Sequence, residues 1–459
     1  MPSLGLAMIV KNAAETLRNC IRSVGGLADQ IVVADTGSSD ATPQLARDLG
    51  AEVFDFSWQD DFAQARNAAL KVLKTDWVLV MDDDEELDLQ ARNKIPQLLG
   101  NANTGGYAVT VRNYLPLRFS IGGHAPSVKP MVATIPRAEQ ARSYADFSLY
   151  RLFRRHAEIY YVGRVHEIVE PSIRALGMKL ASADVVIHHF GHLCSPQELL
   201  VKDEFYRKLG RLKIEDFPND AQSWTEIGQL EYERLQNYSA GIACFKRALA
   251  LPGHSNVPYL SLANLYVDIQ ADARALELLS RVSMKGRSAG AKEHIRGDAL
   301  YNLGNLKEAR AAYTRALHVL SDDARISSKL GLTEVRLGLK KSGLARLICA
   351  SHANPEIFEM HDRLIKAYLL MNMMPEAAEE AGRLATEFPN PVTISRAASI
   401  HAHMSQWKNA EEIILRGLQL FPDNQELLQA QAEVERENAR IAQQITPEPH
   451  LVHARHSAL

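Results

Sequence analysis

The strongest constraint on the fold of this chain is a repeat of about 34 residues in its C-terminal half. Small residues recur at one position of the repeat, with steps of 34, 34 and 33 residues, at Ala309, Gly343, Ala377 and Ala410. Prolines keep the same step at Pro355, Pro389 and Pro422. Two helices approach closely only where the facing side chains are small, so the period predicts pairs of antiparallel helices. Since one pair alone leaves an apolar face uncovered, we expect about six stacked pairs.

This pattern resembles the tetratricopeptide repeat. Its clearest copy spans residues 297–317, and residues 241–252 look like an earlier copy. The resemblance implies an all-α solenoid over residues 220–439, with a concave groove suited to an extended peptide. The alternative is that the solenoid only dimerises the protein or braces the preceding domain. Residues 440–459 are polar and lack periodicity, which predicts a flexible tail.

Residues 1–210 follow a different pattern, in which short β-rich segments alternate with helical ones. Strands are predicted at residues 6–10, 30–34, 53–56, 77–81, 148–153, 160–169 and 184–189. Helices are predicted at residues 14–23, 42–49 and 61–73, the last capped by Asp60 or Asp61. This alternation is typical of an α/β domain with a Rossmann-like, mostly parallel sheet. Residues 113–147 are too rich in proline and glycine for a simple connection, and they predict a lid or an acceptor loop.

Composition narrows the functional classes. With 52 basic and 55 acidic residues the formal net charge is −3, so no nucleic-acid partner is expected. The four cysteines are far apart and form no CxxC pair, which argues against a disulfide framework or a cysteine zinc site. No segment approaches the roughly 18 apolar residues that span a bilayer, and no secretory leader precedes the first strand. We expect a cytoplasmic protein, with any membrane contact peripheral at the inner face.

Acidic side chains follow two of the predicted strands. Asp35 ends one strand and precedes a glycine-containing turn, while Asp82 and Asp84 follow the strand at residues 77–81. In an open parallel sheet, ligands bind beyond the carboxyl ends of the strands. Carboxylates bind a phosphate through a cation such as Mg²⁺ or Mn²⁺, so the acidic pair predicts a metal–diphosphate site. The alternative is that these acids stabilise the start of a following helix.

Four segments together resemble the family 2 glycosyltransferases of the GT-A fold. They read IVKN at residues 9–12, VADTGSSDAT at 33–42, DDFAQARN at 60–67 and DWVLVMDDDE at 76–85. Their order and spacing match the family over residues 4–100. Weaker agreement with the bacterial branch continues at RLFR (151–154), GRVHE (163–167) and HFG (189–191). One departure is the Ala13–Ala14 pair, where the family often has two acidic residues.

The resemblance implies a role for each motif residue. Asp35 would contact the nucleoside of the donor, and Asp82 would face its ribose or the metal ion. Arg66 and Asn67 would lie near the nucleotide, where an arginine can form charge-assisted bonds with a diphosphate. Asp84 would be the principal ligand of Mn²⁺ or Mg²⁺. The alternative for Arg66 is a surface arginine paired with a nearby acid.

Direct displacement of a sugar from its diphosphate inverts the anomeric centre and needs a base to take the proton of the acceptor. Glu167 is the candidate base. His166 is predicted to complete the metal shell or to orient this base, and His189 to join the metal shell or close over the donor. For Glu167 and His166 the alternative is a polar strand face with ordinary cross-strand pairs.

These features predict an inverting, metal-dependent glycosyltransferase. The expected donor is a nucleotide sugar, with a UDP-sugar as the first choice. The expected acceptor is a peptide or protein that the repeat domain presents. A small acceptor would not need a solenoid, whereas an extended segment fits a concave array. The alternatives are transfer to lipopolysaccharide core or to a lipid-linked glycan, and a repeat scaffold without activity.

Overall fold

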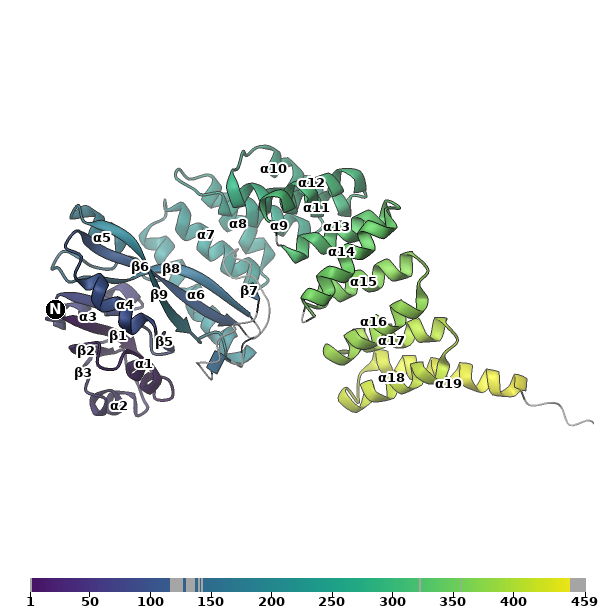
Figure 1. Cartoon of the computed structure of the whole chain (residues 1–459), viewed down its shortest axis with the longest axis horizontal. Helices are drawn as coiled ribbons and strands as arrows, with labels where there is room; N and C mark the ends of the chain where they lie inside the picture. Colours follow the sequence, from purple (N-terminus) through teal and green to yellow (C-terminus); the bar gives the residue numbers. More distant parts are fainter. Residues whose placement is uncertain are drawn as a thin grey trace, which may run out of the picture. The chain divides into compact units, whose positions relative to one another are not determined.

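The computed structural model describes residues 2–115, 127–128, 137–138, 141, 143–321, 323–355 and 357–445. The chain forms two compact units, Met1–Leu265 and Tyr266–Leu459. The first unit contains a β-sheet with its helices, and the second is helical (Figure 1). The predicted fold class, an α/β domain followed by an all-α repeat, is confirmed. The predicted domain limits, 1–210 and 220–439, stay a prediction. They mark a change in the sequence pattern, whereas the two units are defined by how compactly their residues pack.

The first unit alternates strands and helices along its first 100 residues. Its strands are β1 (Leu4–Val10), β2 (Gln30–Asp35), β3 (Glu52–Asp55), β4 (Trp77–Val80), β5 (Glu85–Leu87), β6 (Thr104–Leu115), β7 (Ser127–Val128), β8 (Ser143–Arg154) and β9 (Lys179–His189). Its first helices are α1 (Leu17–Val24), α2 (Thr42–Asp48), α3 (Phe62–Val72), α4 (Ala91–Leu99) and α5 (Glu170–Ala175). Asp61 caps α3 as predicted, because its carboxylate accepts a hydrogen bond of 2.9 Å from the backbone N–H of Gln64.

The strand order in the sheet is β3-β2-β1-β4-β8-β6-β9-β5, with β7 paired to β8. Strands β1 to β4 are mutually parallel, as predicted. Beyond β4 the sheet is mixed, since β8 runs antiparallel to β4 and β6, and β5 runs antiparallel to β9. The parallel half carries the crossover helices that the sequence pattern predicts. The mixed half, in which β6 and β9 are parallel, joins segments distant in sequence and brings residues 84–87 beside residues 187–190.

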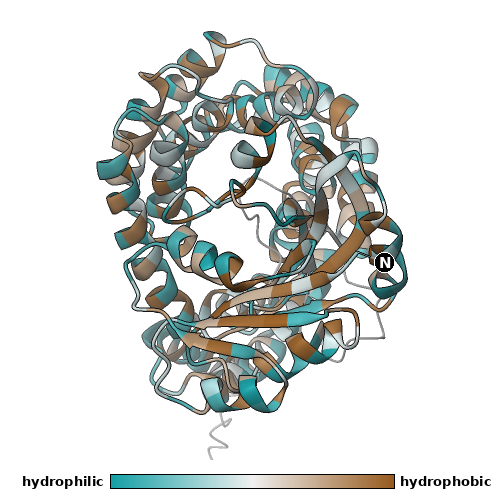
Figure 2. Cartoon of the chain, turned by 90° about the vertical axis from the view of Figure 1, so that its left-hand side faces the viewer, coloured by the Kyte–Doolittle hydropathy of each residue, from teal (hydrophilic) through white to brown (hydrophobic). Residues whose placement is uncertain are grey.

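The core lies on both faces of the sheet. Along β1, Leu6 and Met8 face one apolar cluster with α1, whereas Ala7 and Ile9 face another cluster with α3. This alternation is what a strand buried on both faces requires, and it explains why β1 reads as a continuous apolar run. Figure 2 shows the strands as largely hydrophobic.

The predicted strand at residues 160–169 is wrong. The segment makes only one bridge, between Val162 and Ile168, because the chain turns back on itself. Gly163 and His166 have positive φ angles of 101° and 53°, which an extended strand does not contain. The segment is therefore a tight loop. Its apolar residues Tyr161 and Val169 belong to the same buried cluster as the alanines of α3.

Two other regions differ from the predictions or lie beyond them. The acidic residues 82–84 lead into strand β5 and not into a helix, so the alternative of a helix start is wrong. Most of residues 113–147, the predicted lid or acceptor loop, lie outside the described residues. Among the described residues, no helix combines the length and the apolar character that a bilayer crossing demands.

The chain from residue 196 onward is helical. Its helices are α6 (Pro196–Asp216), α7 (Ala221–Gln229), α8 (Tyr238–Leu249), α9 (Val257–Asp268), α10 (Asp272–Ser280), α11 (Gly286–Asn302), α12 (Leu306–Val319), α13 (Ala324–Arg336), α14 (Lys340–Ala353), α15 (Phe358–Leu370), α16 (Met374–Glu387), α17 (Pro391–His403), α18 (Trp407–Leu420) and α19 (Gln425–Ile445). A π-helical turn, Leu230–Arg234, extends α7. Helix α19 continues past residue 440, where we predicted a flexible tail, and residues 446–459 lie outside the described part.

The predicted small-residue register is confirmed by packing. Ala309, Ala377 and Ala410 are fully buried. A Cβ on Gly343 would lie 2.5 Å from the carbonyl oxygen of Gly331 on the preceding helix, so the two backbones touch. The three prolines of the repeat fall in the links between successive pairs, ahead of α15, α17 and α19.

A second periodic feature marks the turn inside each helix pair. One residue per turn has a positive φ angle, at Gln236, Gln270, Gly304, Gly338, Asn372 and Ser405. The steps between them are 34, 34, 34, 34 and 33 residues. The described chain therefore contains six such turns, in agreement with the predicted number of pairs, and the series starts at Gln236.

Candidate functional site

Asp35 lies at the carboxyl end of β2, between Val10 of β1 and Asp55 of β3. Its buried carboxylate accepts hydrogen bonds from the hydroxyl of Ser38 (2.5 Å) and from the backbone N–H of Ser38 (3.2 Å). Asn12, with a φ of 52°, binds the same turn through its backbone N–H, 2.8 Å from the Ser38 hydroxyl. The turn after β2 is therefore fixed around Asp35 at the edge where ligands bind such sheets.

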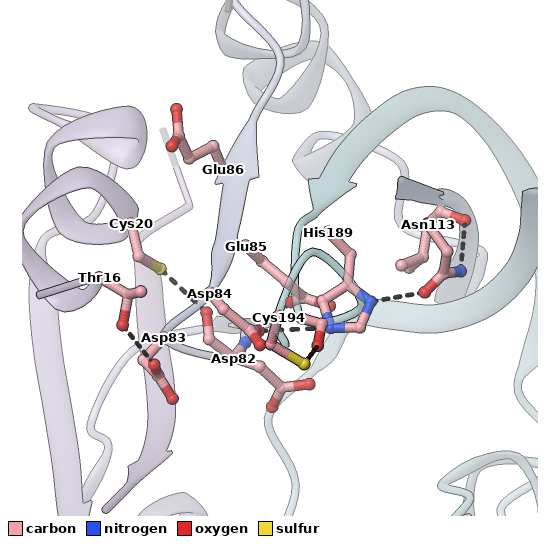
Figure 3. Close-up of polar contacts among 12 residues, drawn as sticks. Thr16, Cys20, Asp82, Asp83, Asp84, Glu85, Glu86, Asn113, His189 and Cys194 are labelled. Carbon is pink, nitrogen blue, oxygen red and sulfur yellow. Dashed lines mark hydrogen bonds and ion pairs between the residues drawn. The ribbon is translucent and has the colours of Figure 1, made fainter. Parts of the chain in front are cut away.

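Asp84 lies between β4 and β5, opposite the end of β9 (Figure 3). The backbone N–H of Phe190 donates to the carbonyl oxygen of Asp84 (3.1 Å), which continues the β5–β9 pairing. Nε2 of His189 lies 3.3 Å from Oδ1 of Asp84, and its Nδ1 lies 2.5 Å from Oδ1 of Asn113. Burial opposes protonation of His189, but the charge of Asp84 raises its pKa to about 9. A protonated imidazole satisfies both acceptors and makes His189 the cationic partner of Asp84.

Asp82 is held by two arginines. Its Oδ1 lies 2.7 Å from Nη2 of Arg66, and its Oδ2 lies 3.0 Å from Nη2 of Arg151. Burial alone would raise the pKa of Asp82, but these two charges outweigh it and hold the pKa well below its usual range. Asp82 therefore fixes the two guanidinium groups, and its predicted role toward the ribose or the metal ion stays a prediction.

Glu85 also belongs to the network of Asp82, Arg66 and Arg151. Its side chain is buried, its Oε2 accepts the backbone N–H of Asp82 (2.8 Å), and its Oε1 lies 3.3 Å from Arg151. Burial raises the pKa of Glu85 to about 7. The neighbouring Asp83 points the other way and accepts a hydrogen bond of 2.5 Å from the hydroxyl of Thr16. Burial and the charge of Asp84 raise the pKa of Asp83 to about 6.

Arg66 joins Asp82 to the candidate base. Its Nε lies 2.5 Å from Oε1 of Glu167, and its side chain is only 7% exposed. Its remaining nitrogen, Nη1, is buried without a hydrogen-bond partner among the described residues. The guanidinium is therefore a buried cation whose charge is balanced by Asp82 on one side and Glu167 on the other. The alternative of a surface arginine is therefore wrong.

Asn67 does not point into this cluster. Its side-chain amide pairs with the backbone of Tyr161, donating to the carbonyl oxygen (2.9 Å) and accepting from the N–H (2.8 Å). Asn67 therefore clamps α3 to the loop at residues 156–169, which carries Glu167. Its predicted place near the nucleotide stays a prediction, while its visible task is to position Glu167.

His166 is separated from the acidic residues. Its positive φ turns the exposed ring outward from the loop, and the ring stacks on Tyr206 of α6 with centroids 6.4 Å apart. Among the described residues, no group of three His, Cys, Asp or Glu side chains is gathered in a way that could hold a metal ion. The predicted ligand set Asp82, Asp84, His166 and His189 is thus not brought together as a cage.

A divalent ion nevertheless fits beside Asp84. Its carboxylate is a hard oxygen donor, and Mg²⁺ or Mn²⁺ commonly takes one or two carboxylates together with phosphate oxygens and water. Gly191 leaves the space that this carboxylate occupies, since a Cβ there would lie 2.4 Å from Oδ2 of Asp84. The donor set is therefore one protein carboxylate, and the remaining ligands would have to come from the substrate and water.

Sequence reasoning missed three residues that organise the site. Arg151 and Glu85 lie inside the RLFR and DWVLVMDDDE motifs, but the sequence predicted no role for either of them. It predicted none for Asn113. The signal for Arg151 is a charged side chain within β8 between apolar neighbours, which requires a buried acidic partner. No local signal identifies Asn113, because its partner His189 lies 76 residues later in the sequence, on the neighbouring strand β9.

Comparison with known proteins agrees with this geometry. Residues 6–127 match the model of Glycosyl transferase family 2, and residues 249–337 match that of a tetratricopeptide repeat-like domain. The chain therefore carries a family 2 glycosyltransferase domain followed by tetratricopeptide-like repeats.

Three relatives illustrate both parts. A TPR repeat-containing protein of Synechococcus elongatus is 30% identical over 50% of this chain and 52% of its own length. An uncharacterized glycosyltransferase of Rickettsia bellii is 34% identical over 22% of this chain and 34% of its own. The prophage-derived glycosyltransferase SunS of Bacillus subtilis is 25% identical over 36% of this chain and 34% of its own. The chain thus spans about half or less of the length of these curated relatives.

Proposed function

We propose that the protein is an inverting, metal-dependent glycosyltransferase that moves a sugar from a nucleotide sugar, UDP-linked for preference, to a peptide or protein acceptor. The observation that carries the proposal is the linked cluster of Asp84, Asp82, Arg66 and Glu167 at the carboxyl edge of the parallel strands. It combines a carboxylate suited to a divalent ion, a buried arginine that joins two acidic side chains, and a carboxylate suited to proton transfer.

The donor would lie across the ends of β1, β2 and β4. Asp35 offers a buried, rigidly held carboxylate for the nucleoside, and the guanidinium of Arg66, which pairs with Asp82 and Glu167, would lie near the diphosphate. A Mn²⁺ or Mg²⁺ ion bound at Asp84 would supply charge stabilisation for the departing diphosphate. His189 keeps the Asp84 carboxylate in place from the side of β9.

Glu167 would take the proton of the acceptor. Arg66 engages only Oε1, so among the described residues Oε2 is left without a hydrogen-bond partner. The side chain is 12% exposed, which gives an acceptor hydroxyl, thiol or amide access to it. Arg66 holds this carboxylate directly, and Asn67 fixes the loop that carries it through the backbone of Tyr161, so its position is set before an acceptor arrives.

A tetratricopeptide-like array commonly presents a concave surface to extended polypeptides, which supports a peptide or protein acceptor. Since donor and acceptor binding rest on different parts of the chain, they can be tested separately.

The donor is tested by a thermal-shift screen of nucleotide sugars with and without Mn²⁺, followed by an assay of donor hydrolysis. One nucleotide should raise the melting temperature of the wild type in a Mn²⁺-dependent manner. Asp84→Ala should lose the Mn²⁺ dependence and reduce hydrolysis at least about 100-fold. Asp88→Ala, four positions later at the end of β5, is the matched control. Unchanged hydrolysis in Asp84→Ala would refute the metal assignment.

A further inference from the structure

An aromatic cluster lies directly beside the candidate base. It consists of Trp58 from the segment before α3, Phe62 at the start of α3, and Phe205 and Tyr206 of α6, and we call it the aromatic platform. Its ring centroids are 5.0 to 6.2 Å apart, within the range of favourable edge and stacked contacts. Phe205 and Tyr206 are 38% and 39% exposed. A cluster of this size is normally buried, so its exposed faces indicate a binding surface.

The platform is continuous with the site. Tyr206 stacks on His166, which precedes Glu167, and the backbone N–H of Phe62 donates to the carbonyl oxygen of Arg164 (2.9 Å). An acceptor group at Glu167 would therefore have its neighbouring atoms over the platform.

The polar groups around the platform are already paired with one another. Asp60 binds Nζ of Lys208 (2.6 Å) and Nε1 of Trp58 (3.0 Å). Arg164 pairs with Asp216, and Asp61 caps α3. The charged groups of the rim are thus largely engaged with one another, with three carboxylates against two cations.

This pairing decides between two kinds of occupant. A sugar ring can stack on an aromatic face, but its hydroxyls compete for hydrogen-bond partners with charged groups that already bind one another. An apolar side chain needs none and gains by removing the rings from water. Val201, one turn before Phe205 on α6, is 72% exposed and extends the apolar surface along the helix.

We propose that the aromatic platform is an acceptor subsite that binds an apolar side chain of the acceptor polypeptide, within a few residues of the side chain that is glycosylated. The proposal rests on the proposed function. It narrows the acceptor of the glycosyltransferase to polypeptides that carry an apolar side chain near the glycosylated residue. The sugar donor and the acceptor nucleophile are those of the glycosyl transfer, so the platform adds no chemical step of its own.

The test uses synthetic 15-residue peptides in a Gly/Ala/Lys background, each with one central Ser, Thr, Asn or Cys. A single guest residue, Phe, Leu, Ala or Lys, is placed within four positions of the centre. Transfer from the nucleotide sugar found by thermal shift is measured by mass spectrometry. The rate of sugar transfer to each peptide is divided by the rate of donor hydrolysis in the same sample. This ratio removes differences that arise only from donor binding.

Peptides with Phe or Leu should be glycosylated about tenfold faster than those with Ala or Lys. Phe205→Ser should abolish this preference, and Val201→Ser, at a residue too exposed to affect folding, should weaken it. Leu89→Ser is the matched control, because Leu89 is an apolar residue of the same domain that is 58% exposed. It should keep the full preference.

The outcomes separate the two proposals. A wild type that hydrolyses no nucleotide sugar would overturn the proposed function and the subsite with it. Hydrolysis without any preference for Phe or Leu, or with a preference that survives in Phe205→Ser, would overturn the subsite alone. Transfer to an oligosaccharide with no transfer to any of the peptides would also overturn it.

Discussion

Oδ1 of Asp84 and Nε2 of His189 lie 3.3 Å apart, although 105 residues separate them in the sequence (189 − 84 = 105). The pairing of β5 with β9 brings them together, with Glu85 opposite His189. The acidic motif after β4 and the HFG motif after β9 are therefore two sides of one site. Their separation in the sequence reflects the mixed half of the sheet, which inserts β6 and β8 between them.

Gly191 is expected to be essential to this arrangement. A Cβ at this position would lie 2.4 Å from Oδ2 of Asp84 and 2.7 Å from Nε2 of His189. Gly191→Ala should therefore displace the Asp84 carboxylate and lower Mn²⁺-dependent donor hydrolysis by about 10-fold or more. The matched control is Gly382→Ala in α16, where nothing lies within 4 Å of the added atom. Equal hydrolysis by the wild type and Gly191→Ala would contradict this packing.

Arg151 is expected to stabilise the folded protein through its two acidic partners. Arg151→Met leaves Asp82 and the buried Glu85 without their shared cation, and we expect a loss of about 3 kcal/mol in the free energy of unfolding. Urea denaturation measures this loss. The double variant Arg151→Met/Glu85→Gln should recover part of it, because a neutral amide needs no counter-charge. Additive effects of the two substitutions would show that the pair is not coupled.

The turns of the repeat give a prediction that isolates backbone conformation. Gly304 has a φ of 79°, and nothing lies within 4 Å of the position that an added Cβ would take, so Gly304→Ala should cost about 1 kcal/mol through strain alone. Gln270 occupies the equivalent turn with a φ of 59°, and Gln270→Gly should change stability in the opposite direction. Urea denaturation of both variants is the measurement. Changes of the same sign in both would contradict the shared role of these turns.

The features that local patterns specify could be predicted from the sequence. Asp35 and Asp84 stand where apolar strands end, and the small residues such as Ala309 recur with the period of the helix pairs. The partners of these residues could not be predicted, because Arg151 reaches Asp82 from β8 across a strand pairing that no periodicity encodes. The strand predicted at residues 160–169 failed because its β-rich composition does not reveal the positive φ of His166.

The buried pair of His361 and Glu380 predicts a pH dependence of stability in the repeat. Nδ1 of His361 lies 2.5 Å from Oε1 of Glu380, and Nε2 lies 2.8 Å from the carbonyl oxygen of Pro355. Both ring nitrogens thus face acceptors, which favours the imidazolium form. Burial opposes the charge, but the bond to Glu380 outweighs it and raises the pKa of His361 above its ordinary 6.5. The bond to His361 and the charge of Arg383 likewise lower the pKa of Glu380 below its ordinary 4.5 against the effect of burial.

The sign of the effect follows from these directions. The contribution of His361 is fully present below pH 6.5 and is lost as the pH rises through its raised folded pKa. The contribution of Glu380 is present above pH 4.5 and is lost as the pH falls through its lowered folded pKa. Urea denaturation should therefore show greatest stability between these values and a decline on the alkaline side. In His361→Gln that alkaline decline should become shallower, and a slope identical to the wild type would show that His361 does not carry it.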